Sequence, residues 1–258
     1  MLQGQMLRGK AAVVTGADRE IGAAMAEALA GAGAAVVVAH HAAPEAAEAA
    51  AGRIRQAGGT AFVEAADLST VAGNAALVER AVARLGRLDI FVANAGITVW
   101  GPFLETDEAA WDAVAGLNLK GAFFGAQAAA RRMVAQGEGG RIVFSSSVTG
   151  VAALPDCAPY AVAKAGLRHM ARVLALELGP HGITVNALGI GATVNARNLG
   201  DDPEYAARWA GVIPVRRCGR PEDAAAALSY LVSPAAGMVS GHTLMLDGGW
   251  SAVGDAPR

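Results

Sequence analysis

Short runs rich in valine and isoleucine alternate along the chain with longer, alanine-rich segments whose apolar residues recur at helical spacing. Seven runs have the length and composition of buried strands: 11–15, 35–39, 60–64, 89–93, 141–145, 183–187 and 243–246. Six segments are predicted to be helices, the fourth of them broken: 21–31, 44–57, 70–85, 106–136, 159–178 and 221–232. The alternation predicts an α/β fold, a doubly wound parallel sheet of about seven strands with helices on both faces.

The 258 residues fit one large α/β domain. No Pro/Ser-rich linker or charge block interrupts them, and 53% hydrophobic residues with 33 glycines supply a sizeable core and many tight turns. We therefore expect a single domain over 1–258, with a substrate lid within about 192–216.

Charge and cysteine content limit which binding partners and which cellular compartment we expect for this protein. A net charge of −2 without a basic cluster argues against nucleic-acid binding. No apolar run is long enough to span a membrane, and 10–15 leads into a glycine motif rather than a secretory signal. Two cysteines make no disulfide framework, so we expect a cytoplasmic protein with a small-molecule partner, no nucleic acid and no membrane. Cys157 either borders the site or is a small packing residue.

Tyr160 and Lys164 stand four residues apart on the predicted helix 159–178, so their side chains lie on one face. A phenol has a reference pKa of about 10, and an ammonium one turn away favours the phenolate and lowers that pKa. Tyr160 could then exchange a proton with a substrate oxygen that Ser147, at the end of a neighbouring strand, holds by a hydrogen bond. The alternative for an isolated pair is a solvated lysine beside a half-buried tyrosine.

The turn after the first predicted strand reads Thr15-Gly-Ala-Asp-Arg-Glu-Ile-Gly22. A glycine turn between a strand and a helix places backbone N–H groups and the helix N-terminus against a pyrophosphate. Glu20 stands where this loop usually has a small residue. It is either an acid favourably placed in the first helical turn or a group that crowds and repels the phosphates.

The second predicted strand ends without an acid. In dinucleotide-binding folds an acid about 20 residues past the glycines binds the ribose 2′-OH, but here His40 and His41 follow and the next acid is Glu45. A 2′-phosphate would meet no repulsion there, and Arg19 and one of the histidines could attract it. Both histidines could equally be plain loop residues. The sequence therefore favours NADP over NAD.

Three further segments contain residues that could contact a cofactor or support the site. Asp67, followed by Leu68, could meet an adenine edge or cap the helix that starts nearby. The small residues of 94–96 allow a close backbone approach. Asn118 lies between two leucines, and a buried asparagine needs hydrogen-bond partners, so a structural role is equally open.

Together these residues resemble the short-chain dehydrogenase/reductase family over almost the whole chain. The likeness rests on the glycine loop 15–22, on Asn94-Ala95-Gly96, on the thirteen-residue step from Ser147 to Tyr160, and on the ending 241–249. The resemblance implies a Rossmann-like fold and an NAD(P)-dependent oxidoreductase that transfers a hydride between nicotinamide and a secondary alcohol or ketone. It also implies a homotetramer that packs through the helices around 121–136 and 159–178.

By this resemblance Asn118, Ser147, Tyr160 and Lys164 form the catalytic tetrad. Tyr160 is implied to be the general acid/base, Ser147 to orient the substrate oxygen, and Lys164 to lower the tyrosine pKa and hold the nicotinamide ribose. Asn118 is implied to support a water that links Lys164 to solvent. No metal is implied. The residues implied to hold the cofactor are Gly16, Asp18, Arg19, Ile21, Gly22, His40, Asp67, Leu68, Asn94, Ala95, Gly96, Tyr160, Lys164 and Thr193.

Three departures from the family pattern all touch cofactor binding. Glu20 replaces the middle glycine, Ile190 replaces a proline, and Asn195 stands where a threonine commonly contacts the nicotinamide amide or phosphates. They leave a second hypothesis open, a dinucleotide-binding sensor or scaffold with little turnover.

Substrate contacts are expected from segments that vary among relatives: 97–100, 148–157 and 192–216. Trp100 and Trp209 could line a pocket or belong to the core. The general form of the sequence resembles sugar, polyol and 3-oxoacyl reducing members, with sugar or polyol slightly ahead.

Overall fold

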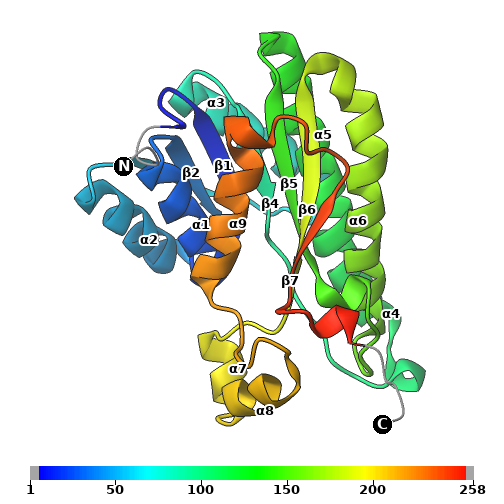
Figure 1. Ribbon diagram of the computed structural model, residues 1–258. Helices are drawn as coiled ribbons and strands as arrows, with labels where there is room; N and C mark the ends of the chain where they lie inside the picture. Colours follow the sequence, from blue (N-terminus) through cyan, green and yellow to red (C-terminus); the bar gives the residue numbers. More distant parts are fainter. Residues whose placement is uncertain (1–5, 254–258) are drawn as a thin grey trace.

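Seven parallel strands form one sheet in the order β3-β2-β1-β4-β5-β6-β7 in the computed structural model, which describes residues 6–253 (Figure 1). The order reverses between β1 and β4, which makes the sheet doubly wound, as predicted. The bounds of the strands are β1 Ala11–Thr15, β2 Ala35–His40, β3 Thr60–Ala65, β4 Ile90–Ala93, β5 Gly140–Ser147, β6 Ile183–Ile190 and β7 Thr243–Leu246.

Helices cover both faces of this sheet (Figure 1). On one face lie α1 (Glu20–Gly31), α2 (Pro44–Gln56) and α9 (Pro221–Val232). On the other lie α3 (Val71–Leu85), α5 (Ala122–Gln136) and α6 (Ala158–Leu178). Each strand feeds both cores because successive side chains point to opposite faces: Val14 packs under α1, and Val13 packs on the opposite side.

The long helical segment predicted near 106–136 is interrupted. Helix α4 (Glu108–Val114) passes into a π-helical turn, η2 (Ala115–Gly121), before α5 begins. A Cβ at Gly121 would collide with the carbonyl oxygen of Leu68, so the glycine allows a close approach of the two backbones. Such π turns are frequent at functional sites, and this one carries Asn118.

Strands β5 and β6 continue further than the sequence predicted. They end at Ser147 and Ile190, which are paired in register, and β6 is in turn paired with β7. Ser147 is therefore held at the carboxyl edge of the sheet by strand pairing. Within residues 6–253, the helices are all too short or too polar to cross a membrane.

The expected lid segment contains two short helices, α7 (Ala196–Asp201) and α8 (Tyr205–Val212), which lie beyond the carboxyl ends of the strands (gold in Figure 1). Asn195 caps α7 by accepting a hydrogen bond from the N–H of Asn198 at 2.7 Å. The ring of Trp209 packs edge-on against Trp250 at 5.3 Å between centroids, which attaches α8 to the chain after β7.

Candidate active site

A cleft of about 940 Å³ opens at the carboxyl ends of the strands, where the strand order reverses. In sheets of this kind ligands bind at that place. The predicted site residues that line it are Gly16, Asp18, Arg19, Ile21, Gly22, Asn94, Ala95, Gly96, Ser147, Tyr160, Lys164 and Thr193. Four others lie outside the lining: His40, Asp67, Leu68 and Asn118.

Lys164 is buried behind Tyr160 on the first turns of α6. Its ammonium lies 5.4 Å from the centre of the Tyr160 ring and donates a hydrogen bond to the carbonyl oxygen of Ser145 at 2.6 Å. Ser146 Oγ donates to the main-chain oxygen of Lys164 at 2.7 Å, which fastens α6 to β5. Burial lowers the pKa of Lys164 to about 8.

The pKa of Tyr160 differs from the expectation that Lys164 would lower it. Burial raises the pKa of the phenol, while hydrogen bonding by Ser147 and the positive charge of Arg197 act in the opposite direction. The physical reason is geometric, because the Lys164 ammonium faces the ring and is bonded to Ser145. At neutral pH, Tyr160 is therefore a protonated phenol, ready to act as an acid.

Ser147 presents its hydroxyl beside Tyr160. The side chain is buried, and its Oγ accepts a hydrogen bond from the N–H of Thr149 at 3.2 Å. The hydroxyl hydrogen remains available to donate to the phenolic oxygen of Tyr160 or to a substrate oxygen. Ser147 thus differs from the two serines before it in β5, because Ser145 and Ser146 both bond to Lys164.

Asn118 supports the wall of the cleft from behind. Its side-chain amide accepts a hydrogen bond from the N–H of Ile97 and donates one to the carbonyl oxygen of Ile97, both at 2.8 Å. This clamp fixes the segment that follows β4, which does line the cleft. A Cβ on Gly96 would come 3.1 Å from Asn118 Oδ1 and 3.5 Å from Lys164 Nζ, so the neighbouring backbone passes close to both side chains.

The glycine loop has the close contacts that a nucleotide cradle requires. Gly16 has φ of +60°, and a Cβ on Gly22 would collide with the carbonyl oxygen of Gly16. Asn94 Nδ2 donates to the carbonyl oxygens of Thr15 and Gly16 at 3.0 and 3.1 Å, and its Oδ1 accepts from Ser145 Oγ at 3.0 Å. The loop is thus held against β4 and β5, and its shape fits the pyrophosphate of a dinucleotide.

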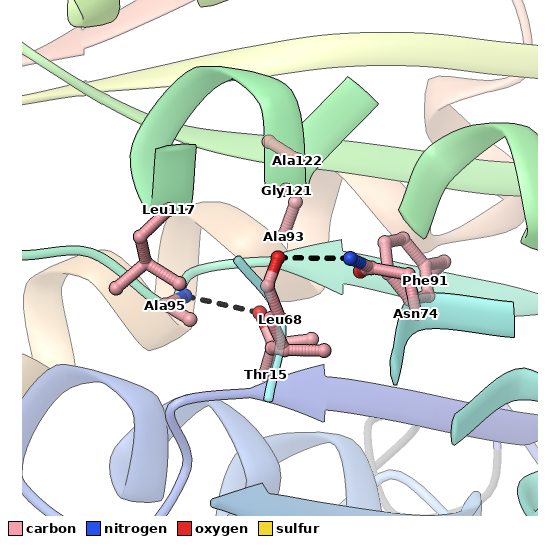
Figure 2. A pocket seen from close by; sticks show the side chains of 9 residues that line it. All are labelled: Thr15, Leu68, Asn74, Phe91, Ala93, Ala95, Leu117, Gly121 and Ala122. Atoms are coloured by element: carbon pink, nitrogen blue, oxygen red, sulfur yellow. Dashed lines mark hydrogen bonds between the residues drawn. The ribbon is translucent and has the colours of Figure 1, made fainter. Parts of the chain in front are cut away.

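A second, much smaller cavity of about 10 Å³ lies among Thr15, Leu68 and Ala95 (Figure 2). Figure 2 shows Asn74 bonded to the carbonyl oxygen of Leu68 at 2.9 Å and the N–H of Ala95 bonded to Thr15 Oγ1 at 3.0 Å. The volume is about the lower limit for one water molecule, so it excludes any substrate. The Leu68 side chain lines this void and packs in the core, which leaves only its backbone for a cofactor.

Two other residues predicted to contact the cofactor are hydrogen-bonded to neighbouring residues of the chain. His40 is buried, and its Nδ1 accepts a hydrogen bond from the N–H of Ala43 at 3.2 Å. The exposed Asp67 carboxylate accepts bonds from the hydroxyl and the N–H of Ser69, which lower its pKa. The alternative that Asp67 caps the next helix is wrong, because Thr70 is the N-cap of α3.

The departures at Glu20 and Asn195 are connected through the lid. Glu20 begins α1 with φ of +50°, a left-handed conformation that favours glycine. Its Oε1 accepts a hydrogen bond from the N–H of Ala196 at 2.8 Å, next to the cap residue Asn195. The Glu20 carboxylate therefore joins the glycine loop to the lid, a contact that the sequence did not predict. Thr193 is buried and donates its hydroxyl to the carbonyl oxygen of Gly191 at 3.0 Å.

Several residues that line the cleft lie in the segments expected to contact the substrate, but the sequence did not identify them individually. Thr98, Thr149, Arg197 and Tyr205 line the cleft together with Trp100 and Trp209. Their positions in the three predicted substrate segments were the available signal. Cys157 lies outside the lining and is fully buried, as a packing residue would be.

Comparisons with known proteins agree with this geometry. A family model described as Enoyl-(Acyl carrier protein) reductase matches residues 16–251. The 2-dehydro-3-deoxy-D-gluconate 5-dehydrogenase of Escherichia coli (strain K12) is 38% identical over 249 residues, which cover 95% of this chain and 97% of the relative. The cis-4-hydroxycyclohexanecarboxylate dehydrogenase of Sinomonas cyclohexanicum is 39% identical and is covered completely, against 97% of this chain.

A solved structure shows the same fold. The short-chain type dehydrogenase/reductase from Mycobacterium marinum superimposes with a TM-score of 0.90 at 34% identity, over 96% of this chain and 97% of that one. The chain belongs to the short-chain dehydrogenase/reductase family. It is an NAD(P)-dependent oxidoreductase that transfers a hydride between nicotinamide and a secondary alcohol or its ketone. The expectation of such an enzyme is confirmed.

Proposed function

We propose that this enzyme catalyses the reversible, NADP-dependent oxidation of a secondary hydroxyl on a sugar-like or polyol-like substrate. The observation that carries the proposal is the convergence of Ser147, Tyr160 and Lys164 on one large cleft whose walls carry both polar and apolar side chains. Similar proteins support the substrate class. They include the dehydrogenases of Escherichia coli and Sinomonas cyclohexanicum, whose named substrates carry a carboxylate, and an L-rhamnose 1-dehydrogenase (NAD(P)(+)) of Azotobacter vinelandii.

In the proposed mechanism Tyr160 donates its phenolic proton to the substrate oxygen during reduction and accepts it back during oxidation. Ser147 donates a hydrogen bond to the same oxygen and withdraws electron density from the carbonyl. Lys164, whose ammonium lies 5.4 Å from the centre of the Tyr160 ring, would hold the nicotinamide ribose. Asn118 positions the wall through Ile97. Once bound, the nicotinamide supplies or accepts the hydride.

The cofactor would be held by the glycine loop, by Asn94–Gly96 and by Lys164 and Thr193, all of which border the cleft. The preference for NADP rests on charge. Arg19 has two thirds of its side chain exposed. Within 6–253 its one partner is Asp18 at 2.6 Å, so most of its guanidinium N–H groups remain available to a 2′-phosphate. His40 is less suited to that role than the sequence suggested, since it is buried and bonded to the backbone.

Titration calorimetry with NADPH and with NADH tests the cofactor assignment. We expect NADPH to bind more tightly, and Arg19→Gln to reduce the difference while leaving NADH binding within about twofold. A preference of about tenfold or more for NADH in the unaltered protein would contradict the assignment.

The proposal also includes a single domain in which α7 and α8 form a lid over the cleft. Four copies of this domain are proposed to form a homotetramer. Large apolar side chains are exposed on the outer surfaces of α5 and α6: Phe123, Val134, Val162, Val173 and Leu176. Leu176 has 81% of its surface exposed, an arrangement that favours burial against another copy. Light scattering should give the mass of four chains, and a monomer would contradict this part of the proposal.

A further inference from the structure

Among the residues that the structure describes, one charged side chain of the cleft has no ion-pair or hydrogen-bond partner. The cleft is lined by five charged groups: Asp18, Arg19, Glu20, Lys164 and Arg197. The first two form an ion pair at 2.6 Å, Glu20 accepts the N–H of Ala196, and Lys164 donates to a main-chain oxygen. Within residues 6–253, Arg197 forms no ion pair and no side-chain hydrogen bond.

Arg197 lines the cleft from the lid segment. It belongs to the first turn of α7, whose start is fixed by the Asn195 cap and by the bond from Ala196 to Glu20. Burial raises the pKa of the Tyr160 and Tyr205 hydroxyls, and the Arg197 charge acts against it in both cases. The guanidinium is therefore close enough to the proton-donating phenol for its field to act on it.

The surroundings of Arg197 suit a small, hydroxylated molecule with one negative charge. Thr98 and Tyr205, which carry hydroxyl groups, line the same cleft together with two tryptophans. A guanidinium offers five N–H donors in a planar fork that matches the two oxygens of a carboxylate. An exposed arginine usually points into solvent without a function, but this one borders the cleft that also holds Tyr160 and has no partner among the described residues.

We propose that Arg197 binds the carboxylate of a hydroxy-acid or sugar-acid substrate and so orients the reacting hydroxyl against Ser147 and Tyr160. The inference rests on the proposed function, since it specifies the substrate class of the same site. Because Arg197 is carried by α7, binding of the anion also draws the lid over the cleft. Neutral alcohols lack this contact and are turned over less efficiently.

The test compares acids with their primary amides, which keep the shape and lose the charge. The probes are gluconate, 3-hydroxybutyrate and cis-4-hydroxycyclohexanecarboxylate, each beside its carboxamide, with the unaltered enzyme, Arg197→Gln and Arg197→Lys. Arg208→Gln is the matched control, because Arg208 lies on α8 of the same lid with most of its side chain exposed and does not line the cleft.

We expect kcat/KM for the best acid to exceed that for its amide, and Arg197→Gln to lower the acid value about 10- to 100-fold. The amide value should change less than about threefold, with partial rescue by lysine and no effect of Arg208→Gln. Equal losses for acid and amide, or no loss for the acid, would overturn the role of Arg197. Turnover of the amides by the unaltered enzyme would still leave the oxidoreductase function intact in that case.

Calorimetry of the same acids on the cofactor-loaded protein gives a readout that needs no turnover. Binding should be present in the unaltered protein and lost in Arg197→Gln, while NADPH affinity stays within about twofold. If the substitution instead weakens NADPH about tenfold and leaves acid binding unchanged, Arg197 serves the cofactor phosphates and the inference is wrong.

Discussion

Replacing Glu20 by glycine should tighten cofactor binding. Glu20 stands in the glycine loop with φ of +50°, and its carboxylate reaches across to the N–H of Ala196 on the lid. A negative charge so placed stands beside the loop proposed to hold the cofactor phosphates. The substitution removes this charge and gives the position the residue that its backbone conformation favours.

The size of the effect follows from Coulomb's law. Two unit charges about 4 Å apart interact with about 1 kcal/mol in water and about 4 kcal/mol at an effective dielectric constant of about 20. Because Glu20 is partly exposed, the lower part of this range applies, about 1–2 kcal/mol. NADPH should therefore bind about 5- to 30-fold more tightly to Glu20→Gly. Relief of the left-handed backbone, about 1 kcal/mol, and loss of the bond to Ala196 roughly cancel in the free energy of unfolding.

Titration calorimetry of NADPH at low and high salt measures this effect, with Glu20→Gln as the matched variant. Glutamine keeps an oxygen that can accept the Ala196 N–H and removes only the charge. It should recover most of the gain, and the gain should shrink at about 0.5 M salt because the repulsion is screened. Unchanged affinity in both variants, or weaker binding in Glu20→Gly alone, would refute the repulsion. In the second case Glu20 would serve chiefly to hold the lid.

Two further predictions concern proton transfer and the wall of the cleft. Because the pKa of Tyr160 is raised, its protonated form dominates at neutral pH, and kcat/KM for oxidation should increase with pH over the alkaline range. Arg197→Gln should move this increase to higher pH, because the Arg197 charge lowers the pKa of Tyr160. A pH-independent oxidation rate would contradict the raised pKa. Asn118→Ala removes both bonds to Ile97 and leaves part-buried backbone groups unpaired, which should cost about 1–3 kcal/mol in urea unfolding and lower kcat more than it weakens NADPH binding. A loss below about 0.5 kcal/mol would contradict the clamp.

Local periodicity and turn chemistry account for most of what the sequence predicted. The first and last strands, 11–15 and 243–246, and the helix 221–232 have the predicted bounds, because each is set by a short-range pattern of apolar residues and breakers. The ends of β5 and β6 were underestimated, since Ser147 and Ile190 are held in strand conformation by pairing with each other across the sheet.

The features that sequence reasoning missed depend on contacts between distant segments. The bond from Ala196 to Glu20 joins residues far apart in the chain, and no local pattern at either position indicates it. The lid helices α7 and α8 are short and lie beyond the sheet, although Asn195 could have been recognised as an N-cap. The orientation of Leu68 into the core and the burial of His40 also follow from packing, which composition alone does not reveal.

The most direct test of the central claim is the rate of carbonyl reduction at saturating NADPH by Tyr160→Phe, with Tyr230→Phe as the control. Tyr230 lies on α9 with about half of its surface exposed and does not line the cleft. Loss of the phenolic proton should lower the rate about 10²- to 10⁴-fold, with NADPH affinity unchanged and the control fully active. An unchanged rate in Tyr160→Phe would remove this residue from the mechanism. No turnover in the unaltered protein despite tight NADPH binding would favour a nucleotide-binding sensor on the same fold.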